Sequence, residues 1–169
     1  AKELYQNILQ TFPHNKRAKR GLAEVLKNQR KLSQSSIKTE ADRLGQMYNK
    51  GNFSSVIKKA NSIIKHSPKE VSIWEFLGAA HRGLGNIKEA LAAFKTVVEL
   101  NPNYAAGHNN LGVSFQDLGN YEDSIPCFTK ALSLKSNYAE AHNNLGNSFK
   151  DQGNLKKAIA AYEKAISCK

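Results

Sequence analysis

The most constraining feature of this sequence is a Gly-Asn dipeptide that recurs at a constant interval. The pairs begin at Gly51, Gly85, Gly119 and Gly153, so the spacing from each pair to the next is the same throughout. Self-similarity at a fixed period of roughly 20–50 residues is typical of repeat architectures, in which one supersecondary unit is stacked many times. The period therefore predicts a row of similar units rather than one closed core.

Between these pairs, apolar residues recur at intervals of three and four, as they do on one face of an α-helix. The pattern runs through residues 105–118 and again through residues 121–134. Gly adopts the left-handed conformation that ends many helices, and Asn can cap the start of the next helix. Each unit is therefore predicted to be helix–turn–helix, and the fold class to be all-α.

Small residues inside the predicted helices indicate close packing. Gly78, Gly112 and Gly146 lie there, although Gly in a helix costs about 1 kcal/mol relative to Ala. That cost is tolerable where a partner helix approaches too closely for any side chain. One helix pair cannot bury its apolar stripe alone, so neighbouring pairs must stack. The large residues expected between the helices are Trp74, Leu77, Phe94, Phe115 and Phe128.

These motifs resemble the tetratricopeptide repeat (TPR) family. Residues 74–102, WEFLGAAHRGLGNIKEALAAFKTVVELNP, carry most of its pattern of Trp, Leu-Gly, aromatic, Gly, Ala, aromatic, Ala and Pro. Residues 108–136 and 142–169 carry it with His108 and His142 in place of Trp. Residues 37–70 are similar but match more loosely, because their Leu-Gly pair is displaced by one residue. The resemblance implies a right-handed superhelical solenoid with a concave inner face.

The resemblance also divides the chain into units. TPR units are expected at 71–104, 105–138 and 139–169, the last truncated at its C-terminus, with a divergent TPR at 37–70. Residues 1–36 are expected to form atypical N-terminal helices, namely a partial repeat and one extra helix, and the polar stretch 33–36 is expected either to end that helix or to begin the next one. Because no polar capping helix follows the last unit, we expect the sequence to be a segment of a longer protein.

Positive charge is concentrated in the N-terminal part of the sequence. The formal net charge is +11, of which residues 1–36 carry +6 and residues 37–70 carry +4. Such a surface attracts nucleic acid, anionic lipid or an acidic partner, or it serves only to keep the protein soluble. Aromatic residues for base stacking are scarce nearby, which disfavours nucleic acid. The candidate basic patch consists of Lys16, Arg17, Lys19, Arg20, Arg30 and Lys31.

No set of residues has the spacing of a catalytic or cofactor-binding site. The sequence lacks a Gly-rich phosphate loop, a nucleophile elbow and a zinc-protease motif. His108 and His142 could lie as neighbours, but two imidazoles without a third ligand make a poor metal site, so we expect them to pack between helices. The segment is therefore predicted not to be an enzyme and to hold no cofactor or metal.

The cysteines and the hydropathy pattern bear on the cellular location. Cys127 and Cys168 are the two cysteines, and neither belongs to a CxxC pair, which fits a reducing compartment such as the cytoplasm. The sequence contains no run of about 18 apolar residues, the length that a membrane-spanning helix needs. We therefore expect a cytoplasmic protein without a membrane span.

The resemblance implies that the first helix of each TPR pair lines the concave groove. Asn recurs on this face although it is a poor helix former, and one carboxamide can pair with both the N–H and the C=O of a peptide. We predict that Asn110 and Asn144 form a ladder that holds an extended peptide, similar to the asparagine ladder in the TPR superhelix of O-linked N-acetylglucosamine transferases. Alternatively, these side chains bond within their own helix stack. The predicted groove residues are Phe76, Arg82, Asn109, Asn110, Val113, Gln116, Asp117, Asn143, Asn144, Asn147 and Lys150.

Three functions are consistent with these observations. The first is a protein-interaction scaffold that binds an extended peptide or a partner protein in the groove. The second is a substrate-recruiting or regulatory arm of a larger glycosyl-, sulfo- or methyltransferase whose catalytic domain lies outside this segment. The third is an anionic-surface binder that uses the basic patch.

Two further expectations concern partners. A basic clamp for a C-terminal carboxylate is disfavoured, because acidic residues surround Arg82 and Lys150 on the predicted inner face. Weak self-association is expected, because the last helix leaves an apolar stripe partly uncovered. The acidic residues are Glu75, Asp117, Glu140 and Asp151, and the stripe consists of Ala158, Ile159, Tyr162 and Ile166.

Overall fold

The computed structural model describes residues 1–168, and for residues 28–34 it describes the backbone alone. This part of the chain contains helices and no strand, which confirms the predicted all-α fold. It divides into two compact units, residues 1–43 and residues 44–169.

The N-terminal unit is a hairpin of α1 (Lys2–Thr11) and the first part of α2 (Lys16–Asn49). Asn15 caps α2, because its side-chain oxygen accepts a hydrogen bond of 3.0 Å from the backbone N–H of Ala18. Gly21 allows the two helices to approach, since a Cβ at this position would clash with the ring of Tyr5.

The prediction that a helix ends or begins in the stretch 33–36 is wrong, because α2 continues through it. No Pro or Gly lies between Gly21 and Gly45, and Ser and Gln each lower helix propensity by only roughly half a kcal/mol. A short polar stretch therefore does not break a helix that the flanking residues favour. The expected border between residues 36 and 37 accordingly lies inside α2.

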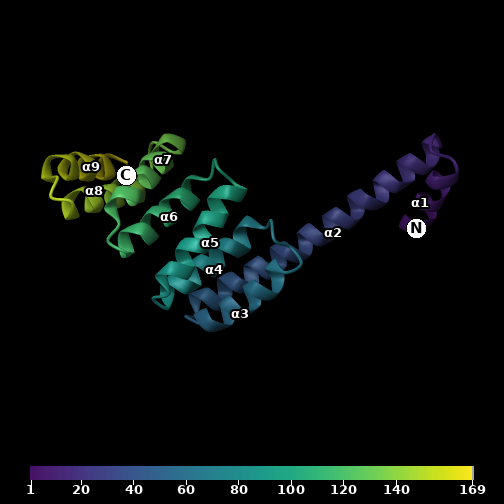
Figure 1. Ribbon diagram of the computed structural model, residues 1–169, viewed down its shortest axis with the longest axis horizontal. Coiled ribbons are helices and arrows are strands. Elements are labelled where there is room, and N and C mark those ends of the chain that lie inside the picture. Colours follow the sequence, from purple (N-terminus) through teal and green to yellow (C-terminus); the bar gives the residue numbers. More distant parts are fainter. Residues whose placement is uncertain (169) are drawn as a thin grey trace. The chain divides into compact units, whose positions relative to one another are not determined.

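The C-terminal unit begins with the end of α2 and continues as helices that each pack against the next one along the chain. Figure 1 shows these helices side by side, from blue to yellow. Their bounds are α3 (Phe53–Ile64), α4 (Val71–Gly83), α5 (Ile87–Leu100), α6 (Ala105–Asp117), α7 (Tyr121–Leu134), α8 (Ala139–Asp151) and α9 (Leu155–Ser167).

The Gly-Asn pairs form the turns within the helix pairs, as predicted. Asn120 and Asn154 cap the helices that follow, because their side-chain oxygens accept backbone N–H hydrogen bonds of 3.2 and 3.4 Å. The glycines have the positive φ angles that L-amino acids with side chains rarely adopt. These angles are +74° at Gly51, +77° at Gly85, +71° at Gly119 and +78° at Gly153.

The glycines inside the first helices allow close approach, which confirms the packing prediction. A Cβ built at Gly78, Gly112 or Gly146 would lie only 2.9, 2.7 or 2.5 Å, respectively, from the nearest atom of an aromatic ring on the second helix. Carbon atoms in good contact are about 3.5–4.0 Å apart, so no side chain fits there. The three pairs are Gly78 with Phe94, Gly112 with Phe128 and Gly146 with Tyr162.

The helix pair at the start of this unit keeps the same register by exchanging the sizes of two residues. Leu44 and Ala60 stand one repeat before Gly78 and Phe94, and both are fully buried. A large residue thus occupies the first-helix position and a small residue the second-helix position, the reverse of the other pairs. This exchange accounts for the displaced Leu-Gly pair without any shift of the helix.

A ring N–H anchors the beginning of three first helices. A carbonyl oxygen can only accept, so in each case the ring nitrogen donates to the carbonyl of the residue six positions earlier. His can replace Trp at this position because both rings carry an N–H, and the role is structural. The bonds run from Trp74 Nε1 to Pro68 O (2.8 Å), from His108 Nε2 to Pro102 O (2.9 Å) and from His142 Nε2 to Ser136 O (3.0 Å).

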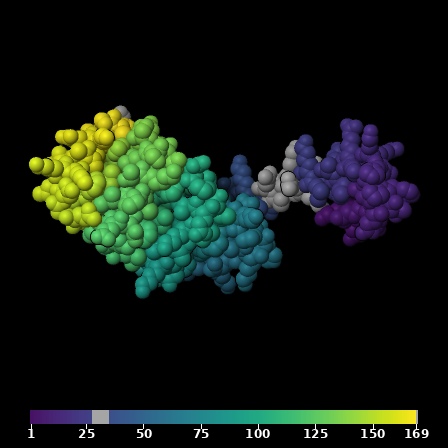
Figure 2. All heavy atoms as spheres, turned by 45° about the horizontal axis from the view of Figure 1, so that its top comes forward, coloured from purple at the N-terminus to yellow at the C-terminus, as the bar shows by residue number. Residues whose placement is uncertain are grey.

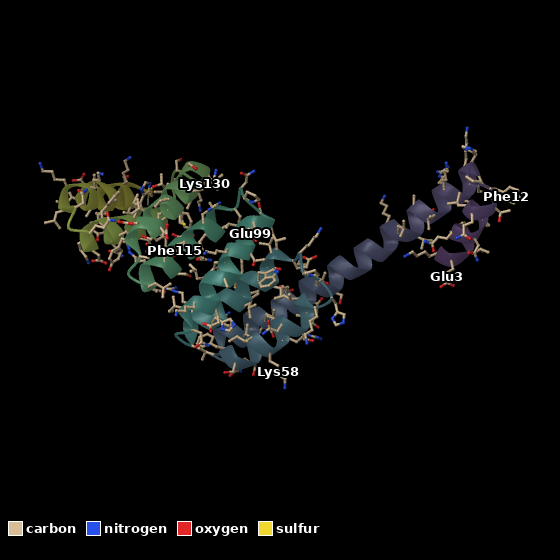
Figure 3. All side chains as sticks on the ribbon, viewed as in Figure 1. Glu3, Phe12, Lys58, Glu99, Phe115 and Lys130 are labelled. Carbon is tan, nitrogen blue, oxygen red and sulfur yellow. The ribbon has the colours of Figure 1, made fainter. Side chains whose placement is uncertain are left out.

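The core of the C-terminal unit is continuous from one helix pair to the next. Phe94 and Val97 of α5 are buried in one cluster with Leu111 of α6, and the repeats adjoin directly in the space-filling view of Figure 2. Charged side chains such as Lys58 on α3 point away into solvent (Figure 3). None of the described helices is both long and apolar enough to cross a membrane.

Candidate functional site

Hydrogen bonds join the first helices of neighbouring repeats into one layer. Arg82 on α4 donates from Nε to Oδ2 of Asp117 on α6 over 2.6 Å. Asn144 on α8 donates from Nδ2 to Oδ1 of Asn109 on α6 over 3.1 Å. The helices α4, α6 and α8 therefore lie next to one another, with the predicted groove residues Arg82, Asp117, Asn109 and Asn144 on their adjoining faces.

A hollow of about 730 Å³ opens on this layer, between α4, α6 and the end of α2. Its volume lies within the roughly 300–1,000 Å³ that is usual for ligand sites. Four predicted groove residues meet in it, and its lining carries groups of both charge signs and three aromatic rings. The lining includes Tyr48, Glu75, Phe76, Arg82, Phe94, Asn110 and Asp117.

Neighbouring residues fix two of the aromatic rings of the hollow, Tyr48 and Phe76. The Tyr48 ring lies against the Phe53 ring, with centroids 5.2 Å apart and an angle of 55° between the planes. The Phe76 ring approaches the backbone at Gly45, where a Cβ would lie 3.3 Å from it. The sequence analysis missed Tyr48, although it stands one repeat before Arg82 and so at the same repeat position.

The charged groups of the hollow differ in their surroundings. Arg82 and Asp117 form a partly exposed ion pair of 2.6 Å. Glu75 is half-buried, and this burial raises the pKa of its carboxyl group, while a hydrogen bond with the Tyr104 side chain opposes the rise. Burial and the same hydrogen bond raise the pKa of Tyr104 to about 12, so its hydroxyl remains a donor to the Glu75 carboxylate at neutral pH.

Asn109 lies within the helix stack. Its side chain is fully buried, donates to Oε1 of Glu140 over 3.1 Å and accepts from Asn144. For Asn109, and for the one N–H of Asn144 that bonds to it, these contacts match the alternative prediction, in which the asparagines bond within their own helix stack.

Asn110 and Asn144 keep capacity for a ligand. Both are half-buried, and within the described residues no hydrogen bond is made by the Asn110 carboxamide. The Asn144 carboxamide uses one N–H for Asn109, and its oxygen accepts no hydrogen bond in the same part of the chain. The predicted ladder thus has the complete carboxamide of Asn110 available, together with the carbonyl oxygen and one N–H of Asn144.

A second polar network connects the two C-terminal repeats and was not predicted. Gln116 Nε2 donates to Asn144 O over 3.3 Å and to Ser148 Oγ over 3.1 Å, and Ser148 Oγ lies 2.8 Å from Ser124 Oγ. Ser124 and Ser148 are fully buried. The Ser124 hydroxyl donates to Tyr121 O over 3.1 Å and accepts from the Ser148 hydroxyl, so both hydroxyls are satisfied. The available signal was Ser124, which stands where Ala90 and Ala158 stand in the adjacent repeats.

The other predicted groove residues differ in exposure. Val113 is buried, at 8% exposure, and Asn143 is exposed. The Asn147 side-chain oxygen accepts a hydrogen bond of 2.7 Å from the Tyr162 hydroxyl. Lys150 is exposed, with its Nζ 3.6 Å from Asp151.

The described part of the basic patch lies at the start of α2. Lys16, Arg17, Lys19 and Arg20 are exposed, and none of them pairs with a carboxylate within the described residues. The side chains of Arg30 and Lys31 lie outside the described residues. The N-terminal end of α2 is the positive end of the helix dipole, so four cationic side chains there interact with it unfavourably. This part of the sequence therefore has a local electrostatic cost.

The described side chains contain no group of three or more His, Cys, Asp or Glu that could hold a metal ion. Cys127 and Cys168 are free thiols. Burial raises the pKa of Cys127 to about 11, and Asp123 nearby adds to the rise, so its thiolate is scarce at neutral pH.

The last helix, α9, exposes a face that is partly covered in α7, the corresponding helix of the preceding repeat. Leu155, Ile159 and Ile166 of α9 are 61%, 57% and 68% exposed. The residues one repeat earlier on α7 are half-buried, where α8 packs against that helix. A second hollow of about 720 Å³, lined by both apolar and polar side chains, lies between α7, α8 and α9.

Two protein-family models match the chain. Residues 103–169 match the model described as tetratricopeptide repeat, and residues 78–119 match the model described as TPR repeat. None of the curated proteins compared with the chain matches it.

Solved structures with the same fold are similar over almost the whole chain. A crystal structure of MamA has a TM-score of 0.73 at 17% identity, over 99% of this chain and 85% of that chain. MamA 41-end from Desulfovibrio magneticus RS-1 has a TM-score of 0.72 at 20% identity, over 99% and 94%. TTC0263, a thermophilic TPR protein in Thermus thermophilus, has a TM-score of 0.65 at 20% identity, over 98% and 80%. At these identities the likeness shows the fold alone.

Proposed function

Because residues 78–169 of this chain belong to the tetratricopeptide-repeat family, which supplies protein-interaction scaffolds, we propose that it binds an extended peptide on the layer of first helices. The hollow between α4 and α6 is the observation that carries this proposal. It is concave, it holds polar groups beside aromatic rings, and it lies on the face where the first helices adjoin.

Asn110 and Asn144 are the residues we propose to hold the peptide backbone. Asn110 offers both an acceptor and two donors, and Asn144 offers its carbonyl oxygen and one N–H, since only its other N–H is used by Asn109. A peptide lying across α6 and α8 could therefore pair with Asn110 through both backbone groups and with Asn144 through an N–H. This arrangement is similar to the asparagine ladder of the O-linked N-acetylglucosamine transferases.

The test uses the full chain and a library of random peptides, from which binders are selected and their dissociation constants measured. Asn110→Ala with Asn144→Ala should weaken binding roughly 150-fold, because about three net hydrogen-bond contributions of 1 kcal/mol are lost. Asn103→Ala with Asn137→Ala is the matched control, since both residues are exposed and also stand one repeat apart. Equal dissociation constants for the two double variants would refute the ladder.

Asn110→Ala alone separates binding from stability. The Asn110 side chain makes no described hydrogen bond, whereas loss of the Asn144 carboxamide leaves the buried oxygen of Asn109 without its donor. The single variant should therefore weaken peptide binding with an unchanged melting temperature.

A second role for the same groove is to recruit substrates or regulators for a glycosyl-, sulfo- or methyltransferase joined to this segment. The proposed asparagine ladder supports this role, and the full-length sequence tests it through the presence or absence of a catalytic domain.

The exposed, unpaired cations at the start of α2 support a separate site for an anionic partner. Lys16→Gln with Lys19→Gln should then weaken binding to polyglutamate or to DNA, and added salt should weaken it steeply. Binding that is already absent at low salt would exclude this site. We place the protein in the cytoplasm, in keeping with its two free thiols.

The exposed face of α9 supports weak self-association. Leu155, Ile159 and Ile166 are more exposed than their counterparts on α7, so a second copy could cover them. Ile159→Glu should shift the sedimentation of a concentrated sample toward the monomer, and a wild-type protein that is monomeric at high concentration would exclude this contact.

A further inference from the structure

The hollow between α4 and α6 has a chemistry that the other repeats lack. Its carboxylate, Glu75, corresponds to Asn109 and Asn143 in the repeats that follow. Its ring, Phe76, corresponds to Asn110 and Asn144. At these two repeat positions, a carboxylate next to an aromatic residue therefore occurs on α4 and not on α6 or α8, and the hollow lies at α4.

Glu75 lacks a cation in the described structure. Burial removes part of its hydration, and its hydrogen-bond partner is the neutral hydroxyl of Tyr104. Arg82 lines the same hollow, but its Nε is taken by Asp117 at 2.6 Å. A half-buried carboxylate without a counter-charge gains more from an incoming cation than a fully solvated one, because the local dielectric is lower.

The aromatic walls suit the side chains that carry such a cation. The Phe53 ring packs against the Tyr48 ring, and the backbone at Gly45 lies close to the Phe76 ring. The positions of both rings are therefore restrained. Aromatic faces attract ammonium and guanidinium groups and cover the methylene groups that precede them. An anionic side chain would meet Glu75 and Asp117 instead.

We propose that this hollow binds a lysine or arginine side chain of the peptide, with Glu75 as the ionic partner and Tyr48 and Phe76 as the walls. This inference rests on the proposed peptide-binding function and names the residue class that the groove selects. The neighbouring ladder would hold the backbone of the same peptide, and the hollow would set its register.

The test is selection from a random peptide library on the full chain, with wild type and Glu75→Gln compared. Wild type should enrich Lys or Arg at one peptide position, and replacing that residue by Gln should weaken binding roughly tenfold. Glu75→Gln keeps the size of the side chain and an oxygen that accepts from Tyr104, so the fold is preserved and the enrichment should vanish. Glu99→Gln, an exposed carboxylate on α5, is the matched control and should keep the enrichment.

The outcomes separate this inference from the function on which it rests. Selected peptides without a basic position, or a basic preference that survives Glu75→Gln, overturn the inference and leave peptide binding intact. A library that yields no binder overturns both. Asn110→Ala should weaken the binding of all selected peptides, while the preference for Lys or Arg at one position is kept. A site that acts through backbone contacts alone would show no such preference.

Discussion

The close approach of Gly112 to Phe128 permits a quantitative test of why these repeats keep glycine inside a helix. In Gly112→Ala, the new Cβ would lie 2.7, 2.9 and 3.0 Å from Cε1, Cδ1 and Cζ of Phe128. Carbon atoms pack at about 3.5–4.0 Å, so the ring or the helix must move by roughly 0.5–1 Å. Phe128 is fully buried and has no open space to move into.

Two effects of opposite sign decide the result of Gly112→Ala. Ala is favoured over Gly inside a helix by about 1 kcal/mol. Overpacking a well-packed core costs about 1–3 kcal/mol. We therefore expect a net loss of about 1 kcal/mol, measured as the free energy of unfolding by guanidinium titration, with a melting temperature lowered by about 2–4 °C for a chain of this size.

A double-mutant cycle with Phe128→Leu isolates the contact. Leu removes the ring atoms that collide with the new Cβ, so the double variant should be more stable than the sum of the single variants, by about 0.5–2 kcal/mol. Gly119→Ala is the control: its Cβ would have no neighbour within 4 Å, and its cost comes from a φ of +71°. Gly119→Ala should therefore show no coupling to Phe128→Leu. A stabilising Gly112→Ala, or zero coupling, would refute the steric explanation.

Three more predictions follow from single residues. Pro126 lies exposed inside α7, where the corresponding residues are Ala92 and Ala160, so Pro126→Ala should raise the free energy of unfolding by about 1–3 kcal/mol in a guanidinium titration. Burial lowers the pKa of His81, so its contribution to the free energy of unfolding should be fully present above pH 6.5 and should fall as the pH drops below this value. In His81→Phe, which introduces the residue found at 115 and 149, the difference in the free energy of unfolding between pH 7.5 and pH 5.5 should be smaller. In a Cys168→Ser background, iodoacetamide at pH 8 should modify Cys127 roughly a hundredfold more slowly in the folded than in the unfolded chain, because its pKa rises from 9.0 to about 11, and equal rates would contradict this burial.

The repeat fold could be predicted because its signals are local and recur. A glycine with positive φ and a small residue opposite an aromatic ring each impose one geometric requirement, and the same requirement returns from repeat to repeat. The capping bond of Asn is less regular, because Asn120 and Asn154 make it through their side chains and Asn52 and Asn86 do not. A helix boundary in the stretch 33–36 was predicted wrongly, because serines there weaken a helix without forbidding it. Propensity is graded, whereas a positive φ and a steric clash are close to all-or-none, and the latter kind of signal is the more reliable.

The candidate site was harder to predict, because one step along a helix turns a side chain by about 100°. Asn109 and Asn110 are adjacent in the sequence, yet Asn109 is fully buried against α8, whereas Asn110 lines the hollow. The side chain that reaches Asn109 comes from Glu140 on another helix, and no periodic pattern on α6 contains that partner. Tyr48 was missed for a related reason: its repeat looked displaced by one residue until the exchange of Leu44 and Ala60 restored the register. A repeat sequence thus specifies which positions share a face, while the partner of each position depends on how the next unit packs against it.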